Sequence, residues 1–77
     1  MTDILIYTIG NSIFIQAAHL IKSATVEILG GTKLLMEKEI CQTDFVKVET
    51  GLPGGKYTVR FFEKDSELEV TKRIELK

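Results

Sequence analysis

The chain has 77 residues, 44% of them hydrophobic, and its formal net charge is −1. This length makes one small domain, residues 1–77, which buries only about 60% of the surface that its unfolded chain exposes. The apolar fraction is that of a globular protein, the balanced charge argues against a nucleic-acid partner, and no apolar run reaches the roughly 20 residues of a membrane span.

Apolar and polar residues alternate along much of the first half of the chain, a pattern that predicts half-buried β-strands. The first two expected strands are Asp3 to Thr8 and Ser12 to Gln16. A tight turn at Gly10-Asn11 joins them, because both residues tolerate a positive φ. The connection from Ala17 to Lys22 does not alternate, and we expect a loop or one helical turn there. The third strand runs from Thr25 to Leu29.

Four more strands are expected in the second half. Gly30-Gly31 forms a hairpin turn into Lys33 to Cys41, which contains good helix formers but is short and follows a hairpin signal. Phe45 to Glu49 is the fifth strand. A Pro/Gly turn then leads into Tyr57 to Phe61, and Leu68 to Leu76 is the last strand.

Seven short strands separated by turn signals predict an all-β fold, a seven-stranded antiparallel immunoglobulin-like β-sandwich. One face of each strand should line a single core between two sheets. The expected core residues are Val26, Ile28, Val46, Val48, Tyr57, Val59, Phe61, Leu68, Val70, Ile74 and Leu76.

Residues suited to catalysis are sparse. Cys41 is the single cysteine, so no intramolecular disulfide forms, and we expect it to be a small apolar strand residue. His19 is the single histidine and has no cysteine or carboxylate at metal-ligand spacing, so we expect a loop histidine without a role. The carboxylates mostly alternate with apolar residues, as on the wet faces of strands. We therefore expect no catalytic residue, no metal, no cofactor and no enzyme activity.

From about Ile4 to Lys77 the chain resembles the C-terminal sorting domain (type A) of the type IX secretion system of Bacteroidetes. Three motifs carry the resemblance: a Gly-containing hairpin at Val26 to Leu34, the Gly-x-Tyr element Gly55-Lys56-Tyr57, and the terminal strand Arg73 to Lys77. The hairpin departs from the family pattern, because it lacks the usual aspartate and has Lys33 where arginine is common.

The resemblance implies a non-catalytic secretion signal at the C-terminus of a larger cargo protein. Such a domain would pass through the periplasm on its way to the outer membrane, the cell surface or the medium. The implied partners are an outer-membrane translocon with a β-barrel shuttle protein, and a sortase-like cysteine peptidase. In some members of the family this peptidase removes the domain and attaches the cargo to the surface, and in others the domain is retained.

The end of the chain is the expected recognition element, since a terminal strand offers edge hydrogen bonds, charge and a free carboxylate. The candidate recognition residues are Gly55, Tyr57, Lys72, Arg73 and Lys77. Gly55 should leave the preceding turn with an unusual φ, and Tyr57 should point inward, with its hydroxyl meeting a partner at the edge of the core.

Two other functions remain open. The first is an immunoglobulin-like structural or adhesion module of a surface protein, without a sorting role. The second is a small carbohydrate-binding sandwich, which needs a platform of exposed aromatic rings, whereas only Phe14 and Phe62 are expected to face outward. The first strand, Ile4 to Ile9, is apolar on both faces, so we also expect a homodimer or strand exchange through it at high concentration.

Overall fold

The computed structural model describes residues 4–77, which form five β-strands and no helix. Their bounds are Ile4–Ile9 (β1), Ser12–Gly30 (β2), Lys33–Glu49 (β3), Gly55–Glu63 (β4) and Leu68–Leu76 (β5). No helix that could cross a membrane occurs in this part of the chain. The predicted start of the first strand at Asp3 lies outside the described residues.

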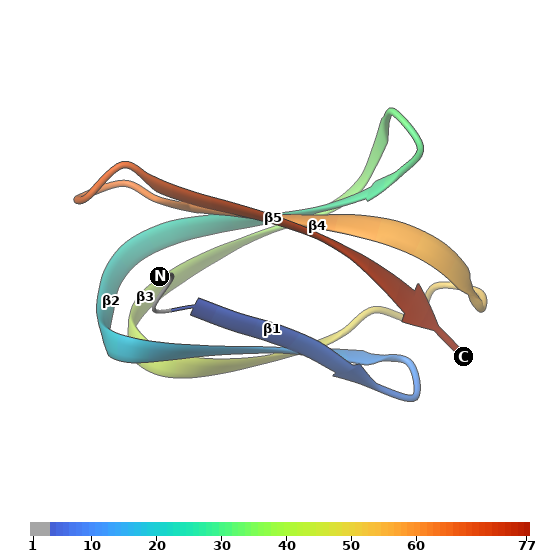
Figure 1. The fold of residues 1–77 in the computed structure, drawn as a ribbon, viewed down its shortest axis with the longest axis horizontal. Coiled ribbons are helices and arrows are strands. Elements are labelled where there is room, and N and C mark those ends of the chain that lie inside the picture. Colours follow the sequence, from blue (N-terminus) through green and yellow to red (C-terminus); the bar gives the residue numbers. More distant parts are fainter. Residues whose placement is uncertain (1–3) are drawn as a thin grey trace.

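The strands form two layers because β2 and β3 are long and bend together (Figure 1). The first half of β2 pairs with β1, and its second half pairs with β4, which in turn pairs with β5. One layer, the β1 layer, therefore contains β1, the first half of β2 and the second half of β3. The other, the β5 layer, contains the remaining halves of β2 and β3 with β4 and β5. All these pairings are antiparallel.

The bend corrects two expectations from the sequence. Ala17 to Lys22 is neither a loop nor a helical turn, because β2 stays extended through it. The register with β3 shifts there, so that residues 17–20 face Asp44 alone. On β3 the adjacent Gln42 has a φ of 54°, an uncommon conformation for a non-glycine residue and one that suits an irregular strand. Two pairs of predicted strands thus merge, and the described chain has five strands instead of seven.

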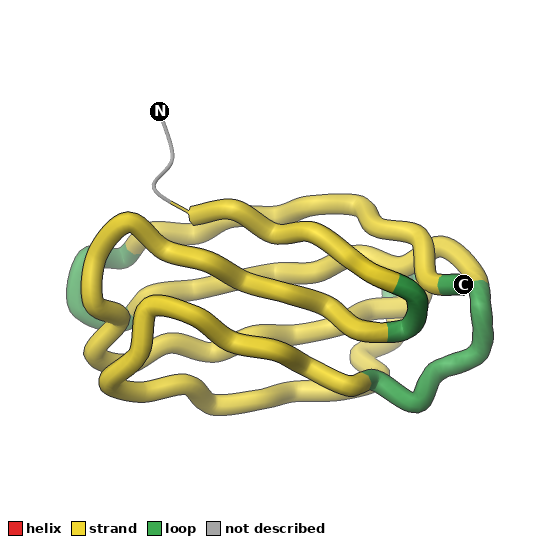
Figure 2. The backbone as a smooth tube through the Cα atoms, turned by 90° about the horizontal axis from the view of Figure 1, so that it is seen from below, coloured by secondary structure: helices red, strands yellow, loops and turns green. Residues whose placement is uncertain are grey.

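The core lies between the layers and contains most of the predicted residues. Val26, Ile28, Val48, Val59, Phe61, Ile74 and Leu76 are buried, whereas Val46, Tyr57, Leu68 and Val70 are only partly buried beside them. The sequence analysis missed the contribution of the N-terminal half, where the buried residues are Ile4, Ile6, Ile13, Ile15, Ile21, Ala24 and Ile40. The turns gather at the two ends of the sandwich (Figure 2).

The sandwich has one laterally closed side and one open side. On the closed side, Lys77 donates its backbone N–H to the carbonyl of Gly10 over 3.1 Å, and the Thr8 hydroxyl donates to the carbonyl of Glu75 over 3.3 Å. On the open side β3 pairs with β2 alone among the described strands, so its outer edge has no strand partner within residues 4–77.

Candidate functional site

Gly55 and Tyr57 shape the turn that enters β4. Gly55 has a φ of 157°, which side-chain-bearing residues rarely adopt, as the sequence analysis predicted. The hydroxyl of Tyr57 donates to the carbonyl of Pro53 over 2.6 Å, so the tyrosine pins the loop to the strand. The ring also lies beside Gly55, because a β-carbon there would be 3.8 Å from Cε2 of Tyr57. Both residues therefore have a structural role.

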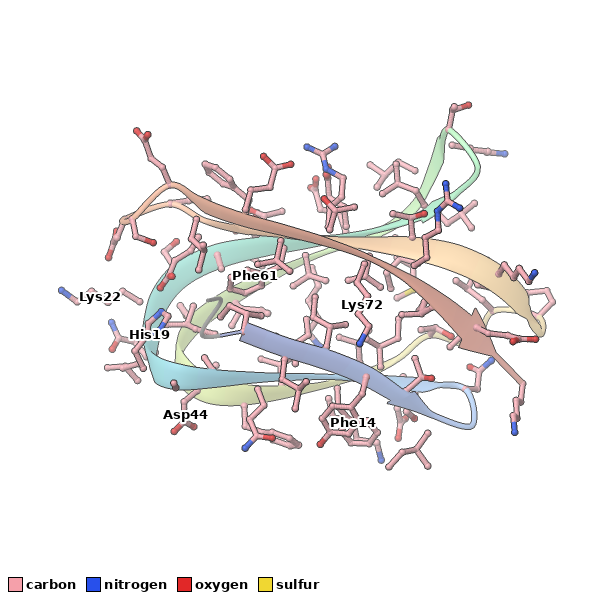
Figure 3. All side chains as sticks on the ribbon, viewed as in Figure 1. Phe14, His19, Lys22, Asp44, Phe61 and Lys72 are labelled. Carbon is pink, nitrogen blue, oxygen red and sulfur yellow. The ribbon has the colours of Figure 1, made fainter. Side chains whose placement is uncertain are left out.

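Lys72 is exposed, but its amino group has a hydrogen-bond partner on β1. It faces Val59 in the β4–β5 register, on the side of the sheet that lines the core. Its ammonium group donates to the carbonyl of Ile6 over 2.6 Å, and thereby links β5 to β1 across the closed side (Figure 3). The amino group of Lys72 therefore connects the β5 layer to the β1 layer by a hydrogen bond.

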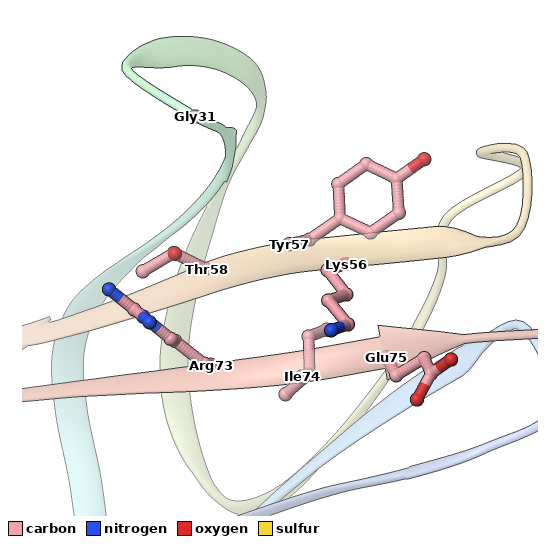
Figure 4. A pocket seen from close by; sticks show the side chains of 7 residues that line it. All are labelled: Gly31, Lys56, Tyr57, Thr58, Arg73, Ile74 and Glu75. Atoms are coloured by element: carbon pink, nitrogen blue, oxygen red, sulfur yellow. The ribbon is translucent and has the colours of Figure 1, made fainter.

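Arg73 and Tyr57 border an open groove of about 570 Å³ on the β5 layer (Figure 4). Its other lining residues are Gly31, Lys56, Thr58, Ile74 and Glu75. Lys77 is exposed and does not line this groove. Of the predicted recognition residues, Tyr57 and Arg73 thus share the groove, Gly55 lies beside the Tyr57 ring, and Lys72 and Lys77 do not line the groove. The groove thus presents two basic side chains, a carboxylate, a hydroxyl and a tyrosine ring.

His19 has a partner that the sequence analysis missed. Its Nε2 atom lies 2.8 and 2.9 Å from the two carboxylate oxygens of Glu63, which is buried at the end of β4. Ser66 donates its hydroxyl to the same carboxylate over 3.1 Å. The expectation of a histidine without a role was wrong, because the bend of β2 carries His19 to a residue 44 positions later in the chain. His19 lies at the bend of β2 (Figure 3), and together with Ser66 it supplies hydrogen bonds to the buried carboxylate of Glu63.

The outer surface of the β1 layer presents three rows of side chains across its three strands. The rows follow the register of the strands, and every residue in them points away from the core. They are Ile9–Ser12–Glu49, Tyr7–Phe14–Lys47 and Leu5–Gln16–Phe45. We call these nine residues the apolar face. Its large apolar side chains include Leu5, Ile9 and Phe45, which are 54%, 65% and 47% exposed.

The aromatic rings of the apolar face lie against one another. Tyr7 and Phe14 stack with ring centroids 5.2 Å apart and an interplanar angle of 11°. Phe45 lies 6.0 Å from Phe14 at 34°, and the Lys47 ammonium is 5.9 Å from the Phe14 ring centroid. Since the rings of Tyr7 and Phe14 cover each other, they form a ladder and not a flat platform for a sugar ring. The sequence predicted the outward position of Phe14 but missed those of Tyr7 and Phe45.

The outer surface of the β5 layer is more polar, although the ring of Phe62 is exposed on it. Arg60 forms ion pairs of 3.2 Å with Glu27 and with Glu69, so it spans three neighbouring strands. Lys64 and Thr25 hydrogen-bond to Glu39 and lower the pKa of its carboxyl group. The two outer surfaces thus differ in character, and the apolar face is the one suited to burial against another protein.

Cys41 lies on a strand, as expected, and its side chain is exposed on β3. Within residues 4–77 no three His, Cys, Asp or Glu side chains come together as a metal-binding group. The described surface thus presents the groove of Tyr57 and Arg73, a second hollow of about 640 Å³ beside His19 and Glu63, and the apolar face.

The arrangement of the strands is that of an immunoglobulin-like β-sandwich. A similar fold occurs in a DUF3244 family protein with an immunoglobulin-like β-sandwich fold from Bacteroides vulgatus, with a TM-score of 0.84. The similarity covers 99% of this chain and 85% of that chain at 16% sequence identity, and at this identity it speaks for the fold alone. No protein-family model and no curated protein matches the sequence.

Proposed function

We propose that the chain is a non-catalytic immunoglobulin-like module of a surface protein, with a structural or adhesive role, which acts through its apolar face. The observation that carries this proposal is the exposure of Leu5, Ile9 and Phe45 around the stacked rings of Tyr7 and Phe14. Contiguous exposed apolar surface on a small domain is typical of a protein interaction site. The stacking of these rings favours a protein partner over a carbohydrate.

Replacing Leu5 and Ile9 together by serine tests the role of the apolar face. Both side chains are more than half exposed, so the variant should fold normally, with a stability within about 1 kcal/mol of the wild type. Cells that display the full protein with these changes should attach less well to a surface or to neighbouring cells. Equal attachment by a folded, displayed variant would refute the proposal, and so would retention of the wild-type protein in the cytoplasm.

A sorting signal of the type IX secretion system is the second candidate. The resemblance of Gly55-Lys56-Tyr57 and of Arg73 to Lys77 supports it, together with the exposure of the basic side chains of Arg73 and Lys77. In this role an outer-membrane translocon, its shuttle protein and a sortase-like peptidase would be the partners. The anchored backbone of Lys77 would hold the charged side chains in a fixed place for a receptor.

The sorting role is tested by fusing the domain to a periplasmic reporter in a cell with the type IX machinery. The wild-type fusion should be exported, whereas Arg73→Glu together with Lys77→Glu should retain the reporter in the periplasm. Both residues are exposed, so each change should alter stability by less than about 0.5 kcal/mol. Export of the variant at the wild-type level would exclude the basic side chains as the signal. Retention of the wild-type fusion would exclude the sorting role.

A further inference from the structure

We propose that the apolar face binds the apolar face of a second copy of this chain. The two copies are related by a twofold axis that lies in the interface and runs parallel to the rows, at the level of Thr8, Ile13 and Val48. These three residues form one row in the register and point inward between two outward rows. The inference rests on the proposed function, since it names the partner of the same surface.

The shape of the apolar face suits packing against another sheet. Upright stacked rings with aliphatic neighbours resemble the inner side of a sandwich, where side chains of two sheets interdigitate across about 10 Å. β1 is apolar on both sides, and its outer side, in the apolar face, is exposed. The inner side of β1 is covered by the core, through Ile4 and Ile6, so the outer side is the one left for a neighbour.

Charge complementarity points to a second copy as that neighbour. Lys47 and Glu49 lie in adjacent outward rows of β3, with Nζ and Oε1 3.3 Å apart. A twofold axis between these rows places Lys47 against Glu49 of the second copy, and Glu49 against Lys47 of the second copy. The two ion pairs then join into one cluster in which four charges alternate in sign.

The same axis matches the rest of the two rows. It sets Tyr7 against Ile9 of the second copy, twice, and Phe14 against Ser12 of the second copy, twice. An axis through the row of Tyr7, Phe14 and Lys47 would instead place Lys47 against itself, and like charges in an interface oppose association. Of these two arrangements the charge pattern therefore favours the first, in which the third row, Leu5, Gln16 and Phe45, lies beyond the two paired rows.

The interface is small, because the face has three strands about 4.8 Å apart. Interfaces of this size fall at the low end, below about 1,200 Å² of total buried area, where association is weak and transient. We expect a monomer at low concentration and a dimer that forms as the concentration rises toward about 1 mM. Strand exchange is not needed, since β1 keeps its pairing with β2 throughout.

Charge reversal provides the test, with analytical ultracentrifugation as the measurement. Lys47→Glu puts four acidic groups together in the dimer, and Glu49→Lys puts four basic groups together. Each single variant should raise the dissociation constant at least about tenfold. The double variant, Lys47→Glu with Glu49→Lys, restores the alternation and should return the constant to near the wild-type value. Lys33→Glu, an exposed change at the start of β3, is the matched control and should leave dimerisation unchanged.

The outcomes separate this inference from the proposed function. Restored dimerisation in the double variant, with equal thermal stability throughout, supports the twofold pairing. A wild-type monomer at about 1 mM overturns it, and so does a dimer that is indifferent to all three variants. If that monomer nevertheless loses cell attachment when Leu5 and Ile9 become serine, the proposed function stands and a different protein covers the face.

Discussion

Phe61 is fully buried between the layers, whereas Tyr57, two residues earlier on β4, is only partly buried. Phe61→Ala should therefore destabilise the domain by about 3–5 kcal/mol, because it leaves a cavity at the centre of the core. That loss is close to the whole stability of a domain of this size. Chemical denaturation measures it, and a loss below about 1 kcal/mol would contradict the observed core.

Tyr57 should contribute less to stability than Phe61, although the sequence placed both residues in the core. Tyr57→Phe should cost no more than about 1 kcal/mol, because the ring stays and only the hydrogen bond to the Pro53 carbonyl is lost. The same denaturation measurement compares the two variants. A cost well above about 1 kcal/mol would contradict the view that this hydrogen bond is all that the hydroxyl supplies.

Glu63 depends on His19, since its carboxylate is buried and His19 contacts both of its oxygens. His19→Leu should cost about 1–3 kcal/mol, because it leaves a buried acceptor with Ser66 as its remaining side-chain donor. His19→Leu combined with Glu63→Leu should recover part of this loss, since replacing both partners by apolar groups removes the unpaired charge. Additive costs in the double-mutant cycle would show that the pair is not coupled.

At the scale of elements, β3 is exposed to strand pairing along its outer edge. Lys38 faces Val26 in the register, so it occupies an inward position on an edge strand, yet its side chain is exposed. Inward charges on edge strands oppose edge-to-edge association, because a second strand would enclose the charge. Lys38→Val should therefore increase aggregation, measured by light scattering at matched protein concentration.

Lys22→Val is the matched control for that prediction. It removes an exposed lysine from the bend of β2 and leaves the outer edge of β3 unchanged, so it should not promote aggregation. Equal aggregation by the two variants would mean that added hydrophobicity, and not the open edge, is responsible.

The elements also show how far the sequence determines the fold. Alternation located the segments that became strands over most of the chain and the core positions Val59, Phe61, Ile74 and Leu76, because a residue on a half-buried strand shows its face by period two. The bend was missed because Ala17 and Ala18 interrupt the alternation while the backbone stays extended. The apolar face was visible in part, through the two-sided character of β1. Its rows, such as Tyr7–Phe14–Lys47, follow from the register of the strands, and local patterning does not supply that register.

For the whole molecule, the closed side decides whether the sandwich holds together as one unit. β1 pairs with β2 along its length, but its contact with β5 depends on a few hydrogen bonds, of which the Lys72 bond to Ile6 is the shortest. These bonds join residues 66 or more positions apart. No local sequence pattern predicts these long-range hydrogen bonds. For that reason Lys72 was interpreted as a recognition residue.

Lys72→Glu should open the closed side without unfolding the β5 layer. The change places a carboxylate opposite the carbonyl of Ile6, so two acceptors meet where a donor and an acceptor were paired. Hydrogen exchange should then become faster in Ile4–Ile9 while the amides of β4 stay protected. Arg73→Glu is the matched control, because Arg73 is the next residue on β5 and its side chain lines the outer groove. Unchanged exchange in β1 of the Lys72→Glu variant would show that pairing with β2 alone holds this strand in the sandwich.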